Sequence, residues 1–169
     1  MASWRSGKPA GPLSGFGLAI VLAVIAIDQV SKLVADSRLP VGQAVDLLPI
    51  LTLYRVNNTG IAFSFLAGLG AIPLIVVMVV VSAVIVVFWA RSHEGGQLAA
   101  AGFALILGGA IGNLIDRMRL GYVIDFLLLH IGDRTLFVFN LADAALTLGP
   151  ALLLLAYMLP AREEGRSGR

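Results

Sequence analysis

Long runs of apolar residues, separated by shorter polar segments, are the main pattern along this chain. A helix needs roughly 20 residues to cross the hydrocarbon core of a bilayer. Four runs reach about this length and predict transmembrane helices over residues 13–35, 71–90, 97–115 and 136–159. We expect the first run to be retained as a span, because it is long and no convincing small-residue cleavage site follows it.

The composition indicates one integral membrane domain over residues 1–169. Of the 169 residues, 59% are hydrophobic and 13% are charged, and the mean hydropathy is +0.94. The small excess of basic residues suits anionic membrane lipids as partners, and no basic patch interleaved with aromatic residues predicts nucleic-acid binding. Without cysteine, thiolate metal sites and a cysteine nucleophile are excluded. No cluster of histidine and carboxylate side chains at ligand spacing predicts a metal site either.

Four spans place both ends of the chain on one side of the membrane. Basic residues near span ends favour the cytoplasmic side. On the side of the termini these residues are Arg5, Lys8, Arg91, Arg162, Arg166 and Arg169, and the opposite loops contain Arg38, Arg55, Arg117, Arg119 and Arg134. The bias is small, and it predicts cytoplasmic termini.

Polar exceptions gather at one end of the predicted spans. They are Asp28 and Lys32 late in the first span, Asn113, Asp116 and Arg117 at the end of the third, and Asn140 and Asp143 early in the fourth. The first and third spans run outward and the fourth starts outside, so these side chains meet at the outer leaflet. Each intramembrane charge costs about 2.5–3.5 kcal/mol on insertion scales. The concentration of this cost at one leaflet predicts a functional site there.

Purely structural roles stay open for the same residues. Asp28 and Lys32 are four residues apart and would form an ion pair on one helix face. Asn140 and Asp143 are three apart at a helix start, as in an N-terminal capping pair. Arg117 suits either a lipid phosphate or the neighbouring Asp116.

The first outer segment, residues 36–70, is too patterned to be a plain connector. The β-branched and aromatic run at residues 50–56 is followed by the turn signal NNTG, which predicts a short strand or hairpin. The next segment, IAFSFLAG, predicts an amphipathic element on the membrane surface. The other outer loop, residues 117–135, carries Asp125 inside a continuous apolar run, unlike a solvent loop.

Asp125 and Asp143 are the candidate chemical core. Two carboxylates in a partly dry site share a proton, so that one acts as an acid and the other as a base, and together they can hydrolyse an amide without a covalent intermediate. No serine, histidine and aspartate set competes, because His93 and His130 lie outside the polar motifs. One alternative is a small proton-coupled transporter, which predicts internal repeats and midplane carboxylates. A purely structural protein is the other.

Five segments carry a family resemblance. They are DQVSK at residues 28–32, NTGIAF at 58–63, GGAIGNLIDR at 108–117, VIDF at 123–126 and FNLADAALTLG at 139–149. In this order they resemble the lipoprotein signal peptidases, the type II signal peptidases of bacteria. Ile61 stands where alanine is common in that family and Leu146 where isoleucine is usual, and neither departure touches the proposed chemistry.

The resemblance implies an aspartic endopeptidase of the inner membrane that cuts prolipoproteins before their diacylglyceryl-modified cysteine. Asp125 and Asp143 match the catalytic pair. The matching supporting or substrate-contacting positions are Asp28, Lys32, Asn58, Asn113, Arg117 and Asn140. No cofactor or metal is implied, and we expect a monomer whose site lies at the outer leaflet.

The fold that the resemblance implies has four transmembrane helices, a small periplasmic β-cradle built from residues 36–70, and a short interfacial helix. The signal peptide of such a substrate is an apolar helix, and its lipidated cysteine stays in the bilayer. We therefore expect a site that opens sideways to lipid. Our hypothesis is that Phe63 and Phe65 gate or seat the first outer loop.

Overall fold

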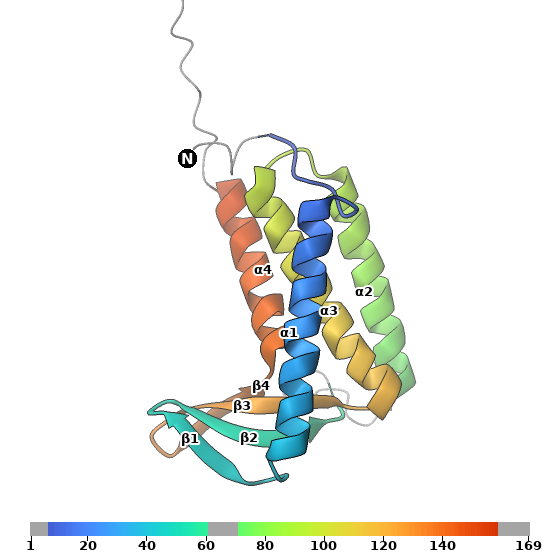
Figure 1. Cartoon of the computed structure of the whole chain (residues 1–169). Helices are drawn as coiled ribbons and strands as arrows, with labels where there is room; N and C mark the ends of the chain where they lie inside the picture. The colour runs from blue at the N-terminus through green and yellow to red at the C-terminus, as the bar shows by residue number, and fades with distance from the viewer. Residues whose placement is uncertain (1–6, 61–70, 159–169) are drawn as a thin grey trace, which may run out of the picture.

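The computed structural model describes residues 7–60 and 71–158, in which four helices form a bundle and a small sheet crosses one end of it (Figure 1). The elements are α1 (Gly15–Arg38), β1 (Ala44–Leu48), β2 (Leu51–Asn58), α2 (Ala71–Arg91), α3 (Gly96–Leu120), β3 (Val123–Ile131), β4 (Arg134–Phe139) and α4 (Leu141–Met158). All four helices are long and apolar enough to span a membrane. The predicted four-helix membrane fold is confirmed.

The fourth predicted span began too early. Helix α4 begins at Leu141 rather than at residue 136, because Arg134–Phe139 form strand β4. An apolar strand directly before an apolar helix makes one continuous hydrophobic run, which periodicity alone does not divide. At the other boundaries, α1 and α3 each extend a few residues past their predicted ends, to Arg38 and Leu120.

The sheet has four antiparallel strands in the order β1-β2-β3-β4. Strands β1 and β2 come from the first outer segment, as predicted. Strands β3 and β4 come from the second outer connection, residues 117–135, and its continuation, for which the sequence predicts no strand. The run from Leu127 to Leu129 is apolar and half-buried on both faces, so it lacks the polar alternation by which a strand is recognised. The predicted interfacial helix, with Phe63 and Phe65, falls on residues 61–70, outside the described residues.

One face of the sheet docks onto the bundle. The strand register aligns Val45, Leu53, Leu127 and Phe139 in one row across all four strands. Leu53 and Leu127 from this row join an apolar cluster at the ends of α1 and α4. The cluster contains Ala35, Leu39, Leu53, Phe126, Leu127 and Leu141. The sheet is thereby held against the ends of two helices, and the residues at that junction are brought together.

Helix α3 is the central helix of the bundle and α2 the most peripheral. Glycines on α3 allow its neighbours to approach closely. A Cβ on Gly109 would lie 2.5 Å from the backbone oxygen of Ala142 in α4, and one on Gly112 would lie 2.6 Å from Oδ2 of Asp28 in α1. Any side chain at these positions would separate the helices that carry the predicted polar residues.

The end of the bundle opposite the sheet is apolar and centres on Trp89. This side chain is 1% exposed and stacks on Phe103 with ring centroids 6.0 Å apart. Its indole Nε1 donates to the backbone oxygen of Ala10 at 2.7 Å. A Cβ on Gly17 would lie 2.7 Å from the indole ring, so α1 meets Trp89 at a residue without a side chain.

Candidate active site

All eight predicted site residues lie in one hydrogen-bonded network at the sheet end of the bundle. Helix α1 contributes Asp28 and Lys32, β2 Asn58, α3 Asn113 and Arg117, β3 Asp125, and the start of α4 Asn140 and Asp143. Six of them are buried, and Asn58 and Asp143 are partly exposed. Residues from five segments of the chain therefore meet at one place, as the sequence predicted.

Asn140 joins the two aspartates. Its side-chain Nδ2 donates to Oδ1 of Asp125 at 2.6 Å, and its backbone N–H donates to Oδ2 of Asp143 at 3.2 Å. Asn140 is fully buried, so its contact with Asp125 is shielded from water, while the contact with Asp143 is partly buried. Two carboxylates, one from β3 and one from the first turn of α4, thus lie on either side of a single asparagine.

The predicted capping role of Asn140 and Asp143 is also present. Asn140 Oδ1 accepts from the backbone N–H of Asp143 at 3.0 Å, while Asp143 Oδ2 accepts from the backbone N–H of Asn140. This reciprocal pair satisfies backbone donors at the start of α4. Capping sets the position of the Asp143 carboxylate and does not compete with a chemical role.

Asp125 lies in a largely dry environment in strand β3. It is 3% exposed, and Asn58 Nδ2 donates to its Oδ2 at 2.9 Å. Burial raises the pKa of Asp125 to about 6, and the negative charge of Asp143 adds to the rise. Hydrogen bonds from Asn58 and Asn140 and the positive charge of Lys32 oppose it. A carboxyl group with a pKa in this range exchanges its proton near neutral pH, as acid–base catalysis requires.

Behind the pair lies a buried charge cluster, which we define as Asp28, Lys32 and Asp116. Lys32 Nζ lies 2.9 Å from Asp28 Oδ2, as the spacing predicted, and 3.0 Å from Asp116 Oδ2. Asp116 Oδ2 also accepts from the backbone N–H of Ile124 at 3.2 Å, which connects α3 to β3. Lys32 further donates to Asn113 Oδ1 at 2.8 Å, and Asn113 Nδ2 donates to Asp143 Oδ1 at 2.8 Å.

Gln29 is a contributor that sequence reasoning missed. Its Nε2 donates to Asp116 Oδ1 at 3.0 Å and to the backbone oxygen of Gly112 at 3.1 Å. The available signal was a second polar residue beside Asp28 inside an apolar span. Its partners Asp116 and Gly112 lie more than 80 residues away in the sequence, so its contacts depend on how α1 and α3 pack.

Arg117 is buried and incompletely paired. Its Nη2 donates to the backbone oxygen of Gly60, and the backbone N–H of Gly60 donates to Asn58 Oδ1 at 3.0 Å. Among residues 7–60 and 71–158, Nε and Nη1 of Arg117 have no hydrogen-bond partner. The guanidinium lies within electrostatic reach of Asp125 and Asp143. Within the described residues, the N–H groups of Arg117 Nε and Nη1 are therefore unpaired.

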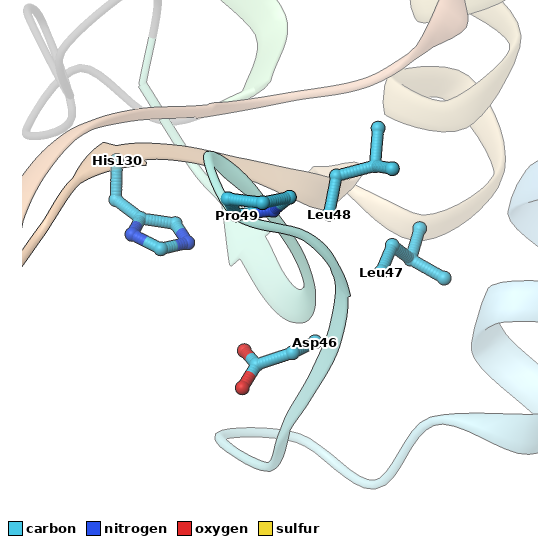
Figure 2. Close-up of a pocket in the computed structure, with 5 residues that line it drawn as sticks. All are labelled: Asp46, Leu47, Leu48, Pro49 and His130. Atoms are coloured by element: carbon cyan, nitrogen blue, oxygen red, sulfur yellow. The ribbon is translucent and has the colours of Figure 1, made fainter.

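A pocket of about 280 Å³ on the sheet is separate from this network (Figure 2). It is lined by Asp46, Leu47, Leu48, Pro49 and His130. Thr52 Oγ1 donates to Asp46 Oδ1 at 2.8 Å and lies 3.0 Å from His130 Nε2. In the described part of the chain, no group of three or more histidine, cysteine or acidic side chains is arranged to hold a metal ion.

Comparisons with known proteins agree on one family. A family model described as Signal peptidase (SPase) II matches residues 20–159, which include the whole network. Lipoprotein signal peptidases of Brucella ovis and Brucella abortus are each 45% identical to this chain over 147 residues, covering 87% of it and 92% of the relative.

Two solved structures of bacterial membrane enzymes share the fold. One has a TM-score of 0.79 at 24% identity and covers 97% of this chain and 98% of its own. The other has a TM-score of 0.77 at 25% identity and covers 94% and 98%. With a family match over most of its length and relatives at 45% identity, this chain belongs to the signal peptidase II family.

Proposed function

We propose that this protein is an aspartic endopeptidase that removes the signal peptide from diacylglyceryl-modified prolipoproteins, cutting before the lipidated cysteine. Membership of a signal peptidase family and four helices suited to a membrane make it a multi-pass bacterial membrane peptidase. The observation that carries the aspartic mechanism is the meeting of Asp125 and Asp143 at Asn140.

In the proposed reaction Asp125 starts protonated and Asp143 ionised. Asp143 takes a proton from a water molecule as that water attacks the scissile carbonyl carbon, and Asp125 gives its proton to the carbonyl oxygen. The resulting gem-diol collapses when Asp143 passes its proton to the amide nitrogen and Asp125 regains a proton from a hydroxyl group. The C–N bond breaks, and both aspartates return to their starting states.

Arg117 and the asparagines support this step. The free Nε and Nη1 donors of Arg117 suit a backbone carbonyl of the substrate beside the scissile bond. Asn58, Asn113 and Asn140 hold the two carboxylates with amide donors and add no charge. The buried charge cluster does not contact Asp125 or Asp143 through Lys32 directly, because Asn113 lies between Lys32 and Asp143.

The substrate class also fits the placement of the network. A signal peptide is an apolar helix, and the two acyl chains on the cysteine stay in the bilayer, so cleavage must occur near the membrane surface. The network lies at the sheet end of the spans, and Arg91 lies at the opposite end. We propose that the sheet end faces the outer leaflet of the inner membrane, that the termini are cytoplasmic, and that the enzyme acts as a monomer.

The direct test is processing of a diacylglyceryl-modified precursor by purified protein. Asp125→Asn and Asp143→Asn should each lower turnover by about 10²–10⁴-fold, because each removes one half of the acid–base pair. Asp133→Asn is the matched control, since Asp133 is exposed in the β3–β4 turn and should process normally. Full activity in either dyad variant would refute the proposal.

A precursor without the lipid should be cut poorly by the unaltered protein if the diacylglyceryl group is part of the recognised substrate. Equal cleavage of both precursors would show that the protein is a membrane peptidase that does not select for the lipid.

The alternative of a proton-coupled transporter has no support from the family match. The two carboxylates also lie at one end of the spans rather than midway along them.

A further inference from the structure

Lys32 has used its full hydrogen-bonding capacity inside the protein. It is 2% exposed, and its three protons meet three acceptors: Asp28 Oδ2 at 2.9 Å, Asp116 Oδ2 at 3.0 Å and Asn113 Oδ1 at 2.8 Å. An ammonium group only donates. Lys32 therefore has no donor left for a substrate or a water. Apart from the effect of its charge on Asp125, any influence of Lys32 on the reaction must pass through its hydrogen-bond partners.

The contact with Asn113 decides which way that amide faces. Asn113 Oδ1 accepts from Lys32 and from Asn140 Nδ2 at 3.2 Å, which leaves Asn113 Nδ2 to donate to Asp143 Oδ1. Turning the amide over would place its NH₂ group against an ammonium and a second amide donor. Its oxygen would then face the Asp143 carboxylate. In a buried site all three contacts become repulsive, so the ammonium selects one orientation.

The orientation of the Asn113 amide also determines the hydrogen bonds of Asp125, through Asn140. The two hydrogens of Asn140 Nδ2 go to Asn113 Oδ1 and to Asp125 Oδ1. If Asn113 turned over, Asn140 would face a donor and its bond to Asp125 would also be disturbed. The amides of Asn113 and Asn140 are therefore both aligned by one cation.

Three elements hold that cation in place. Asp28 Oδ1 accepts from the backbone N–H of Ala142 in α4 at 2.9 Å, and Gln29 donates to Asp116 in α3. Two carboxylates around one ammonium compensate its charge away from water, which a neutral partner would not do. A role in orienting Asn113 explains why three charges are buried here, although apolar residues at the same positions would be at least as stable.

We propose that Lys32 is a positioning residue that acts through Asn113, fixing the amide so that Asp143 always faces a hydrogen-bond donor during catalysis. This inference rests on the proposed aspartic mechanism. It predicts that loss of Lys32 lowers kcat and changes the pH dependence but leaves KM nearly unchanged, since Lys32 does not reach the substrate.

The test begins with Lys32→Met, assayed on the lipidated precursor from pH 5 to 9. Once the Asn113 oxygen can turn toward Asp143, the ionised carboxylate faces an acceptor instead of a donor, so Asp143 keeps a proton up to higher pH and fewer molecules carry the free base. The acidic limb of the kcat/KM profile should then move toward neutral pH by about one unit. We expect kcat to fall by about 10²-fold, as for a small misplacement of reacting groups. An unchanged profile would overturn the proposal.

Lys32→Met leaves two carboxylates buried without a cation and risks misfolding. The triple variant Lys32→Met, Asp28→Asn, Asp116→Asn removes this imbalance, keeps the shape of the cluster, and should show the same shift in the acidic limb. Ser31→Ala is the matched control, because it removes the hydrogen bond from the neighbouring side chain of α1 to the backbone oxygen of Asp28 and leaves the side chains of the cluster and the contact between Lys32 and Asn113 intact. Its pH profile should match that of the unaltered protein.

A double-mutant cycle with Asn113→Leu separates a route through Asn113 from a general field effect. If Lys32 acts through the amide, adding Lys32→Met to Asn113→Leu should lower kcat by less than twofold further. Multiplicative losses would show that Lys32 acts without Asn113 and would overturn the inference. Full activity of Asp143→Asn would instead refute the proposed function itself, so the two failures are distinguishable.

Discussion

The two ends of the helix bundle are held together by opposite means. At the sheet end, helices meet through buried charges and amides, with Lys32, Asn113 and Asn140 at the centre. At the opposite end, they meet through Trp89, Phe103 and small residues that admit a large ring. The same α1 and α3 take part in both arrangements, so the difference does not arise from the fold.

The difference reflects what each kind of contact does best. Between helices in a bilayer, packed apolar side chains stabilise through many van der Waals contacts, and these contacts have little directional preference. A buried hydrogen-bond network adds less net stability, but it admits few geometries, because every unmade bond leaves an expensive polar group. We therefore expect changes at the sheet end to lower activity most and changes at the Trp89 end to lower stability most.

The largest expected effect is on the pH dependence at the sheet end. Asp125 keeps its proton below its pKa of about 6 and loses it above. Because kcat/KM reports the free enzyme, it should fall above pH 6, approaching tenfold per pH unit, as the acid of the pair is lost. The measurement is cleavage of a lipidated peptide in mixed micelles from pH 5 to 9.

Asn58 sharpens this test. Its hydrogen bond lowers the pKa of Asp125, so Asn58→Leu should move the alkaline limb of the profile to higher pH. A profile that stays flat to pH 8 in the unaltered protein would mean that Asp125 does not supply the proton.

A smaller effect on activity should distinguish alanine substitutions at two glycines on one face of α3. A Cβ on Gly112 meets Asp28 Oδ2 at 2.6 Å, and one on Gly108 meets Val24 Cβ at 2.8 Å, so each alanine variant pushes α1 away by a similar amount. Both should lose about 1–3 kcal/mol of stability. Only Gly112→Ala should also lose activity per folded molecule, by about tenfold, because Asp28 anchors the buried charge cluster.

The comparison needs thermal unfolding and single-turnover rates for both glycine variants in the same micelles. Equal losses of activity in Gly108→Ala and Gly112→Ala would show that helix separation alone, rather than the charge cluster, controls the site.

The smallest effect should come from the Trp89 end. Trp89→Phe keeps an aromatic ring but removes the donor to the Ala10 backbone oxygen, which should cost about 0.5–1.5 kcal/mol. Turnover per folded molecule should stay unchanged, because no residue of the network contacts Trp89 through a hydrogen bond or ion pair in the described part of the chain. A loss of turnover without loss of stability would contradict the division between the two ends.

Much of this protein was determined by the sequence alone. The thickness of the hydrocarbon core sets a length, so runs of apolar residues identified the four helices. The cost of intramembrane charge made Asp28, Lys32 and Arg117 conspicuous, and their order along alternating spans predicted that they would meet at one end. Each of these inferences depends on the number of residues in a run or between two residues, and this number can be read from the sequence.

Tertiary structure decided what depends on direction and angle. An apolar run gave no sign of where β4 ends and α4 begins, because both elements bury apolar side chains. The uncharged Gln29 and the backbone of Gly60 gained their roles only when α3 came within hydrogen-bonding distance of them. Which face of the Asn113 amide meets Asp143 follows from the ammonium on the far side, a contact between residues 81 positions apart. Hydrogen-bond polarity is a property of the assembled site, and no single segment of the chain carries it.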